Sequence, residues 1–392
     1  TVKQASPLHH TQLSFKYQSA YRCIHHNHHL PDCCQNLFHD KNNVITALSA
    51  LVIIIFFIPY TASGFAACGK LFNSLFGINY QVAMMLSALL IVGYTITGGF
   101  NAVCVTDLVQ SIVMTGALAI VLIYGISSAG GWTAVMDNAA ALPGYLSLTS
   151  TFDVASGSEV KYNFLTIFST AAWGLGYFGM PHILVRFMAI EDEKKLVLSR
   201  RIASVWVVIA MTAGVLIGIV GLGMTKAGAL ETLTGSNSET IIVRIAGIIS
   251  QHNALTALIA GIILAGILAA TMSTADSQML AAASGVSQNI VHDFLKIKIS
   301  EKTNLLIARL TIVGIAIVSI FLARNPDSSV FKIVSFAWAG FGGAFGAVVL
   351  CSLFWKRCNL AGAIAGIISG GATVFIWKYL IRPLGGILDI YE

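Results

Sequence analysis

Long apolar runs dominate this sequence. Crossing about 30 Å of hydrocarbon takes roughly 20 apolar residues in a helix, and a helix satisfies its own backbone hydrogen bonds there. Nine runs approach that length: 44–69, 81–100, 103–128, 162–187, 201–225, 254–290, 304–323, 330–354 and 360–381. The sequence therefore predicts an all-α polytopic membrane protein with about nine transmembrane helices.

Composition agrees with a chain dissolved in the lipid bilayer. Hydrophobic residues make up 56% and charged residues only 10%, whereas a soluble domain carries about 25% charge. The net charge of +6 lies in short loops rather than in one basic patch, so no nucleic-acid partner is expected. No nucleophile stands beside a base and no phosphate-binding loop follows a strand, which argues against an enzyme and against a bound cofactor.

The basic residues also predict the orientation, because cytoplasmic loops are enriched in Lys and Arg. Three groups of them fall between predicted helices, whereas the long connection 129–161 contains only Lys161. This connection is expected outside, the N-terminus inside and the C-terminus outside. The three groups are Arg186, Lys194, Lys195, Arg200 and Arg201; Lys296, Lys298, Lys302 and Arg309; and Lys356 with Arg357.

Three segments follow from this pattern: a polar, His-rich segment at 1–43, a transmembrane domain at 44–381 and a short tail at 382–392. The first contains seven histidines close to Cys23, Cys33 and Cys34. Their spacing matches no zinc-site pattern, so a disordered or aberrant segment is favoured over a metal site.

The run 172–182 is a candidate substrate site. Gly174, Gly176, Gly179 and Pro181 crowd one predicted helix, and the proline removes a backbone donor, so the helix should kink or unwind. Trp173 and Tyr177 lie four apart and share a face that suits a small ligand. The alternative is an interfacial aromatic belt or ordinary packing.

The run 269–278 is a candidate cation site. Ser273 and Thr274 are adjacent hydroxyls in an apolar helix, and sodium, a hard cation, prefers oxygen ligands such as these and the carbonyl of Ala270. The alternative is that both hydroxyls bond back to a carbonyl one turn earlier. Asp276 is a candidate coupling residue because buried carboxylates are costly in a membrane, whereas Asp107 is expected to cap a helix start.

Several strings together resemble the solute:sodium symporter family, in particular its bacterial proline-transporting branch. The resemblance covers about residues 30–381. The strings are WGLGYFGMPHILVRFMA at 173–189, LPD at 30–32, GGFNAV at 98–103 with TD at 106–107, ILAATMST at 267–274 and VSFAWAGFG at 334–342.

The resemblance implies a leucine-transporter-like core of two inverted repeats of five helices. It also implies sodium-coupled symport of L-proline across the bacterial cytoplasmic membrane by alternating access, with sodium as the co-transported ion. The family's sodium ligands match Ala270, Ser273 and Thr274. Its substrate site matches Tyr94, Trp173, Tyr177 and Pro181.

The chain also departs from the family pattern. Where the family has a peripheral helix and the first two core helices, this sequence has the His-rich segment, and it ends where the proline branch continues. We therefore expect a chain truncated at both ends, arising from a gene fragment or an incorrect gene model. The alternatives are a symporter for pantothenate, another amino acid or a compatible solute, a transporter-like sensor module, and a non-functional fragment.

Overall fold

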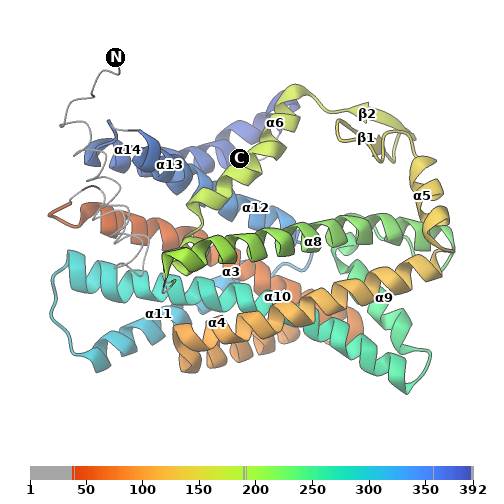
Figure 1. Ribbon diagram of the computed structural model, residues 1–392, viewed down its shortest axis with the longest axis horizontal. Coiled ribbons are helices and arrows are strands. Elements are labelled where there is room, and N and C mark those ends of the chain that lie inside the picture. The colour runs from red at the N-terminus through yellow and green to blue at the C-terminus, as the bar shows by residue number, and fades with distance from the viewer. Residues whose placement is uncertain (1–37, 39, 189, 191, 356, 390–392) are drawn as a thin grey trace, which may run out of the picture.

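A computed structural model of the chain describes residues 38, 40–188, 190, 192–355 and 357–389 (Figure 1). Most of the His-rich segment expected at 1–43 lies outside these residues. The α-helices are α3 (Val44–Phe76), α4 (Tyr80–Ser128), α5 (Trp132–Ala140), α6 (Phe164–Ala172), α7 (Pro181–Met188), α8 (Glu193–Lys226), α9 (Ile241–Ser250), α10 (Ala254–Ser284), α11 (Glu301–Leu322), α12 (Val330–Phe341), α13 (Ala347–Phe354) and α14 (Leu360–Ile376).

The remaining elements are short. Strands β1 (Ser150–Asp153) and β2 (Ser158–Lys161) form an antiparallel hairpin. Four segments are 3₁₀ helices: η1 (Trp173–Gly179), η2 (Gly235–Thr240), η6 (Arg382–Leu384) and η7 (Gly386–Leu388). Three are π-helices that continue α-helices: η3 (Gly285–Phe294), η4 (Gly342–Gly346) and η5 (Trp377–Ile381).

Within the described residues, eight helices are long and apolar enough to cross a membrane. The spans are Val44–Phe76, Tyr80–Phe100, Ala102–Ser128, Lys194–Lys226, Ala254–Phe294, Glu301–Leu322, Val330–Phe354 and Leu360–Leu384. The second and third belong to α4, which bends at Gly99, where the backbone is left-handed (φ 66°). Eight of the nine predicted runs therefore form continuous spans, and the protein is a multi-pass membrane protein.

The ninth predicted run, 162–187, is interrupted as its glycines and proline indicated. It divides into α6, the 3₁₀ segment η1 and α7. Met180 has an extended backbone (φ −79°, ψ 107°) between the last two, and Pro181 begins α7. A proline at a helix start gives up no hydrogen bond, because the first N–H groups of a helix have no partner within it. The predicted break is confirmed.

Helix α3 lies at the centre of the larger core and packs against α4, α10, α11 and α12. Its Phe56 and Phe57 are 1% and 0% exposed, and the Phe57 ring lies 4.7 Å from that of Phe341 on α12. A second, smaller core joins the later span of α4 to α5, α8, α9 and α10. Helix α10 belongs to both groups of contacts, so it links the two cores.

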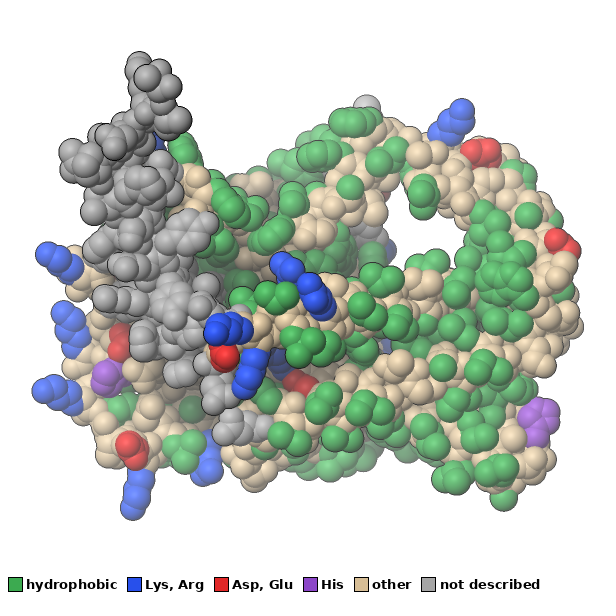
Figure 2. Space-filling view, viewed as in Figure 1, with side chains coloured by type: hydrophobic (Ala, Val, Ile, Leu, Met, Phe, Trp, Pro, Cys, Tyr) green, Lys and Arg blue, Asp and Glu red, His purple; other side chains and the backbone are tan. Residues whose placement is uncertain are grey.

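The two ends of the bundle differ in charge. Figure 2 shows more Lys and Arg side chains at the end where α8 and α11 begin than at the end that carries α5 and the hairpin. The positive-inside rule predicts that the basic end is the cytoplasmic one and that the opposite end is the outer one. At the opposite end, Figure 2 shows an open gap that α5, the β1–β2 hairpin, α6 and α8 surround in Figure 1.

An ion pair ties three elements together at the outer end. The Glu239 carboxylate in η2 accepts from Lys70 Nζ of α3 (2.9 Å) and from Ser329 Oγ (2.7 Å). It also accepts from the backbone amides of Val330 and Phe331 (3.1 and 3.2 Å), which begin α12. Partial burial by itself would raise the pKa of Glu239, but these hydrogen bonds outweigh it and hold the pKa below its usual range.

Candidate substrate and sodium sites

The broken segment η1 carries an aromatic cluster, which we define as Trp173, Tyr177, Phe331, Trp338 and Tyr60. The Trp173 ring stacks on Phe331 with centroids 5.4 Å apart, and the edge of Tyr177 meets Trp338 at 4.6 Å. Trp338 Nε1 donates to the Tyr60 hydroxyl at 3.0 Å. The cluster therefore joins η1, α12 and α3, with Tyr177 remaining 41% exposed.

Glycines bring η1 and α12 close enough for these rings to meet. A Cβ on Gly176 would lie 3.3 Å from the Trp338 ring. A Cβ on Gly179 would lie 2.2 Å from the Phe341 carbonyl oxygen, where η4 follows α12. We call this contact between the backbones of η1 and η4 the glycine crossing. The glycine-rich run 337–346 forms the α12 side of it.

The structure brings Trp173 and Tyr177 together and places Pro181, which is buried, at the turn just beyond them. Two members of the cluster escaped the sequence analysis. Trp338 stands inside the string 334–342, which the sequence analysis used only for the family resemblance. Tyr60 directly follows Pro59, the one proline inside α3, and this proline is the signal that could have singled it out.

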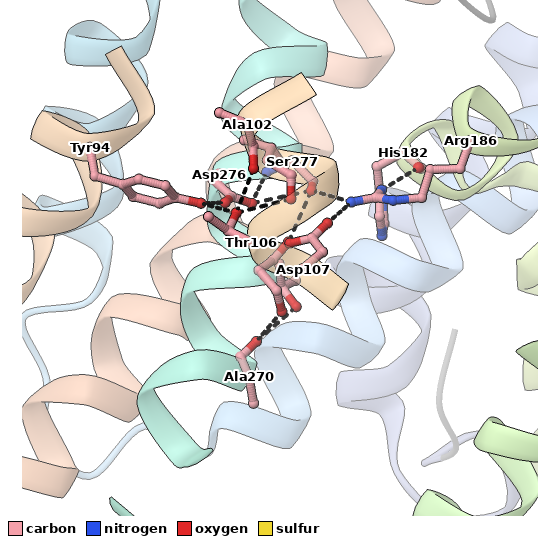
Figure 3. A network of polar contacts seen from close by, with 12 residues as sticks. Tyr94, Ala102, Thr106, Asp107, His182, Arg186, Ala270, Asp276 and Ser277 are labelled. Carbon is pink, nitrogen blue, oxygen red and sulfur yellow. Dashed lines mark hydrogen bonds and ion pairs between the residues drawn. The ribbon is translucent and has the colours of Figure 1, made fainter. Parts of the chain in front are cut away.

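Tyr94 lies elsewhere, in a polar network that Figure 3 shows at close range. Its hydroxyl donates to the Asp276 carboxylate of α10 and lies 3.3 Å from Thr106 Oγ1. Asp276 is fully buried, and its other carboxylate oxygen accepts from the backbone N–H of Ser277. Tyr94 is thus a partner of the candidate coupling residue, and within the described residues it makes no hydrogen bond to the aromatic cluster.

The same network contains an ion pair inside the membrane. Arg186 of α7 donates through Nη2 to the Asp107 carboxylate and to Ser277 Oγ (2.7 Å), and through Nη1 to the His182 carbonyl (2.8 Å). Two expectations were therefore wrong. Asp107 caps no helix, since it lies within the span that begins at Ala102, and Arg186 is no loop residue. A partly buried carboxylate is stabilised by a paired cation, and α7 supplies it.

The expected sodium ligands occupy one turn of α10. Ser273 Oγ and Thr274 Oγ1 both donate to the Ala270 carbonyl, at 3.2 and 3.0 Å. Each hydroxyl hydrogen is used in this bond, so the remaining lone pairs of both hydroxyl oxygens stay available to a cation. The Ala270 carbonyl already accepts two hydrogen bonds, which makes it the weakest of the three candidate ligands.

Comparisons with known proteins agree with this arrangement. The profile of the sodium:solute symporter family matches residues 18–370. A sodium/proline symporter of Staphylococcus aureus is 36% identical over 365 residues, which is 92% of this chain and 68% of that protein. The sodium/proline symporter of Staphylococcus aureus strain Newman matches to the same extent.

A solved structure shows the fold. It is described as the substrate-bound outward-open state of a Na⁺-coupled sialic acid symporter, and it superposes with a TM-score of 0.64 at 16% sequence identity. The match covers 91% of this chain and 77% of that one. The chain has a leucine-transporter-like fold, and it belongs to the sodium:solute symporter family.

Proposed function

We propose that this symporter moves L-proline across the cell membrane together with sodium by alternating access. The observation that carries the proposal is the aromatic cluster on the broken segment η1. Membrane transporters place small substrates where a helix is interrupted, because freed backbone and side-chain groups can contact them there. The Staphylococcus aureus relatives are sodium/proline symporters by name, which supports proline as the solute.

The chemistry of proline suits this cluster. Its ring is apolar on both faces and carries a cationic secondary ammonium. Aromatic faces attract both features, the ring through packing and the cation through the ring quadrupole, which contributes about 0.5–2 kcal/mol. Trp173 and Tyr177 present such faces, and Pro181 sets the turn beside them.

Sodium is proposed to bind the turn of α10 that holds Ala270, Ser273 and Thr274. The turn lies next to Asp276, whose carboxylate is hydrogen bonded by Tyr94 of the earlier α4 span. Asp276 is the proposed coupling residue, because a charge bound nearby changes the field on a carboxylate that two helices share. Occupation of the turn would then bias the packing of α10 against α4.

Uptake of radiolabelled proline into proteoliposomes tests the proposal. An inward sodium gradient should drive accumulation, and an equal potassium gradient should not. Excess unlabelled proline should abolish the signal, whereas pantothenate, betaine and other amino acids compete more weakly. Equal accumulation without sodium would remove the coupling mechanism, and stronger competition by another solute would replace proline as the substrate.

The ion site has its own test. Replacing both hydroxyls, Ser273→Ala with Thr274→Ala, should raise the sodium concentration for half-maximal uptake by about tenfold, equivalent to 1.4 kcal/mol. Thr225→Ala is the matched control, because Thr225 on α8 makes the same bond to a carbonyl one turn earlier, that of Gly221 (3.0 Å). An unchanged sodium dependence in the double variant would place the ion elsewhere.

A further inference from the structure

We propose that Trp338 is a positioning residue that orients the Tyr60 hydroxyl so that it donates to the carboxylate of the substrate. The inference rests on the proposed function, since it concerns how the same cluster recognises an amino acid. It assigns a role to an indole N–H on α12 and a phenol on α3, neither of which the sequence motifs had singled out.

The first step is the direction of the hydrogen bond. An indole N–H can only donate, so in the 3.0 Å contact Trp338 Nε1 is the donor and the Tyr60 oxygen is the acceptor. The hydroxyl hydrogen of Tyr60 must then point away from the indole. Trp338 thus fixes the side from which Tyr60 can donate.

The second step is that the hydroxyl hydrogen of Tyr60 has no acceptor among the described residues. Across the part of the chain that the structure describes, Tyr60 has one side-chain hydrogen bond, the one it accepts from Trp338. The His182 ring makes an edge contact with the Tyr60 ring, with centroids 6.0 Å apart. A hydroxyl donor without an acceptor is costly in a low-dielectric setting, so an acceptor on a bound ligand would be favoured there.

The third step is the rigidity of the indole. Tyr177 meets Trp338 edge-on at 4.6 Å, Trp173 lies 5.8 Å away at 32°, and a Cβ on Gly176 would lie only 3.3 Å from the indole. Trp173 and Tyr177, which would contact the pyrrolidine ring, thus also fix the position of the Trp338 indole that orients the Tyr60 hydroxyl. Ring recognition and carboxylate recognition are coupled through one side chain.

This arrangement orients the substrate. The apolar ring with its ammonium lies against Trp173 and Tyr177, and the carboxylate accepts from Tyr60. A hydrogen bond to a charged acceptor is stronger than one to a neutral acceptor. The site should therefore discriminate proline from prolinamide, which keeps the ring and the ammonium but has a neutral carboxamide in place of the carboxylate.

The experiment measures proline uptake and competition by prolinamide for Trp338→Phe, Tyr60→Phe and the double variant. Trp338→Phe keeps an aromatic ring and removes the N–H. It should raise KM for proline about tenfold with kcat within about twofold, and leave the prolinamide inhibition constant nearly unchanged. The double variant should be no worse than Tyr60→Phe alone, because both changes remove one interaction.

Trp206→Phe is the matched control, because Trp206 of α8 also donates from Nε1, to Thr115 Oγ1 at 3.0 Å, away from the cluster. Thermal stability in detergent is measured for every variant. If Trp338→Phe weakens proline and prolinamide equally, or the two substitutions are additive, Trp338 acts only in packing and the inference fails. If the unaltered protein transports no proline, the proposed function fails instead.

Discussion

The aromatic cluster and the turn of α10 that carries Ser273 to Ser277 differ in both their backbone and their side chains. Around Trp173 the backbone is irregular and the side chains are mostly apolar. In α10 the backbone stays helical and the side chains are polar, with every hydroxyl bonded to a carbonyl of its own helix. A membrane protein can thus place polarity either in the backbone or in the side chains of a span.

The difference has an energetic meaning. On the aromatic side, the close contact of η1 with η4 depends on glycine, so stability there is lost by adding atoms. On the polar side, the Arg186 guanidinium pairs with the Asp107 carboxylate, so stability is lost by removing a charge. The following variants test whether the two regions respond in these opposite ways.

The largest effect is expected for Gly179→Ala. The added Cβ would lie 2.2 Å from a backbone carbonyl oxygen, which cannot rotate away as a side chain can. Overpacking costs about 1–3 kcal/mol and more where backbone must move. Detergent-solubilised protein should melt at a clearly lower temperature. Gly174→Ala is the control, because its Cβ would meet nothing within 4 Å; equal losses in both variants would refute a tight crossing.

Next in size is Asp107→Asn, which leaves the Arg186 guanidinium without its carboxylate partner. Losing a hydrogen bond to a charged group costs about 1.5–3 kcal/mol. Thermal unfolding should show this loss, and Arg186→Met added to Asp107→Asn should recover part of it. As a control, Arg244→Gln removes an exposed pair with Glu231 (3.5 Å) and should change little. Additive losses in the double variant would contradict a direct pair.

Tyr94→Phe decides to which region Tyr94 belongs. If its hydroxyl serves Asp276, the variant should raise the sodium concentration for half-maximal uptake several-fold, corresponding to about 1 kcal/mol for one hydrogen bond, with a smaller change in the KM for proline. Tyr124→Phe is the control, since the Tyr124 hydroxyl also makes a side-chain hydrogen bond, to His252 (3.0 Å), but at an exposed position and not to Asp276. The reverse pattern would return Tyr94 to the substrate site, as the family resemblance implied.

The smallest effect is expected for Glu239 at the outer end. The pKa of Glu239 is lower in the folded protein than its ordinary value of 4.5. Its ion pair therefore stabilises the fold fully above pH 4.5, and this stabilisation is lost as the pH falls from there through the lowered pKa of the folded state. Glu239→Gln should lower stability by about 1 kcal/mol at pH 7, with a smaller difference in acid. Unfolding curves between pH 3 and pH 7 measure this, and a constant difference across that range would exclude the carboxylate as the cause.

Much of the fold follows from the sequence because the membrane imposes a simple rule on each span. The apolar runs predicted the eight continuous spans, and the glycines and proline near Trp173 predicted the interruption of the helix between α6 and α7. The contacts that build the sites are different. Tyr60 meets Trp338 across 278 residues, and Arg186 meets Asp107 across 79. Hydropathy is a local property and carries no information about such pairings.

The two errors share a cause. Asp107 and Arg186 were interpreted one at a time, a carboxylate as a helix cap and a base as a topological charge. Either reading is reasonable for an isolated group near a helix end. Once α7 places Arg186 beside Asp107 of α4, each becomes the partner that makes partial burial of the other tolerable.

The glycine crossing has a mechanical consequence. With only backbone between η1 and η4, no flexible side chain can absorb a small shift of one against the other. A displacement of the segment that carries Trp173 and Tyr177 would therefore move α12 by nearly the same amount. A small molecule that binds between these two segments and separates them would block their coupled movement, and would not merely compete with the substrate for its site.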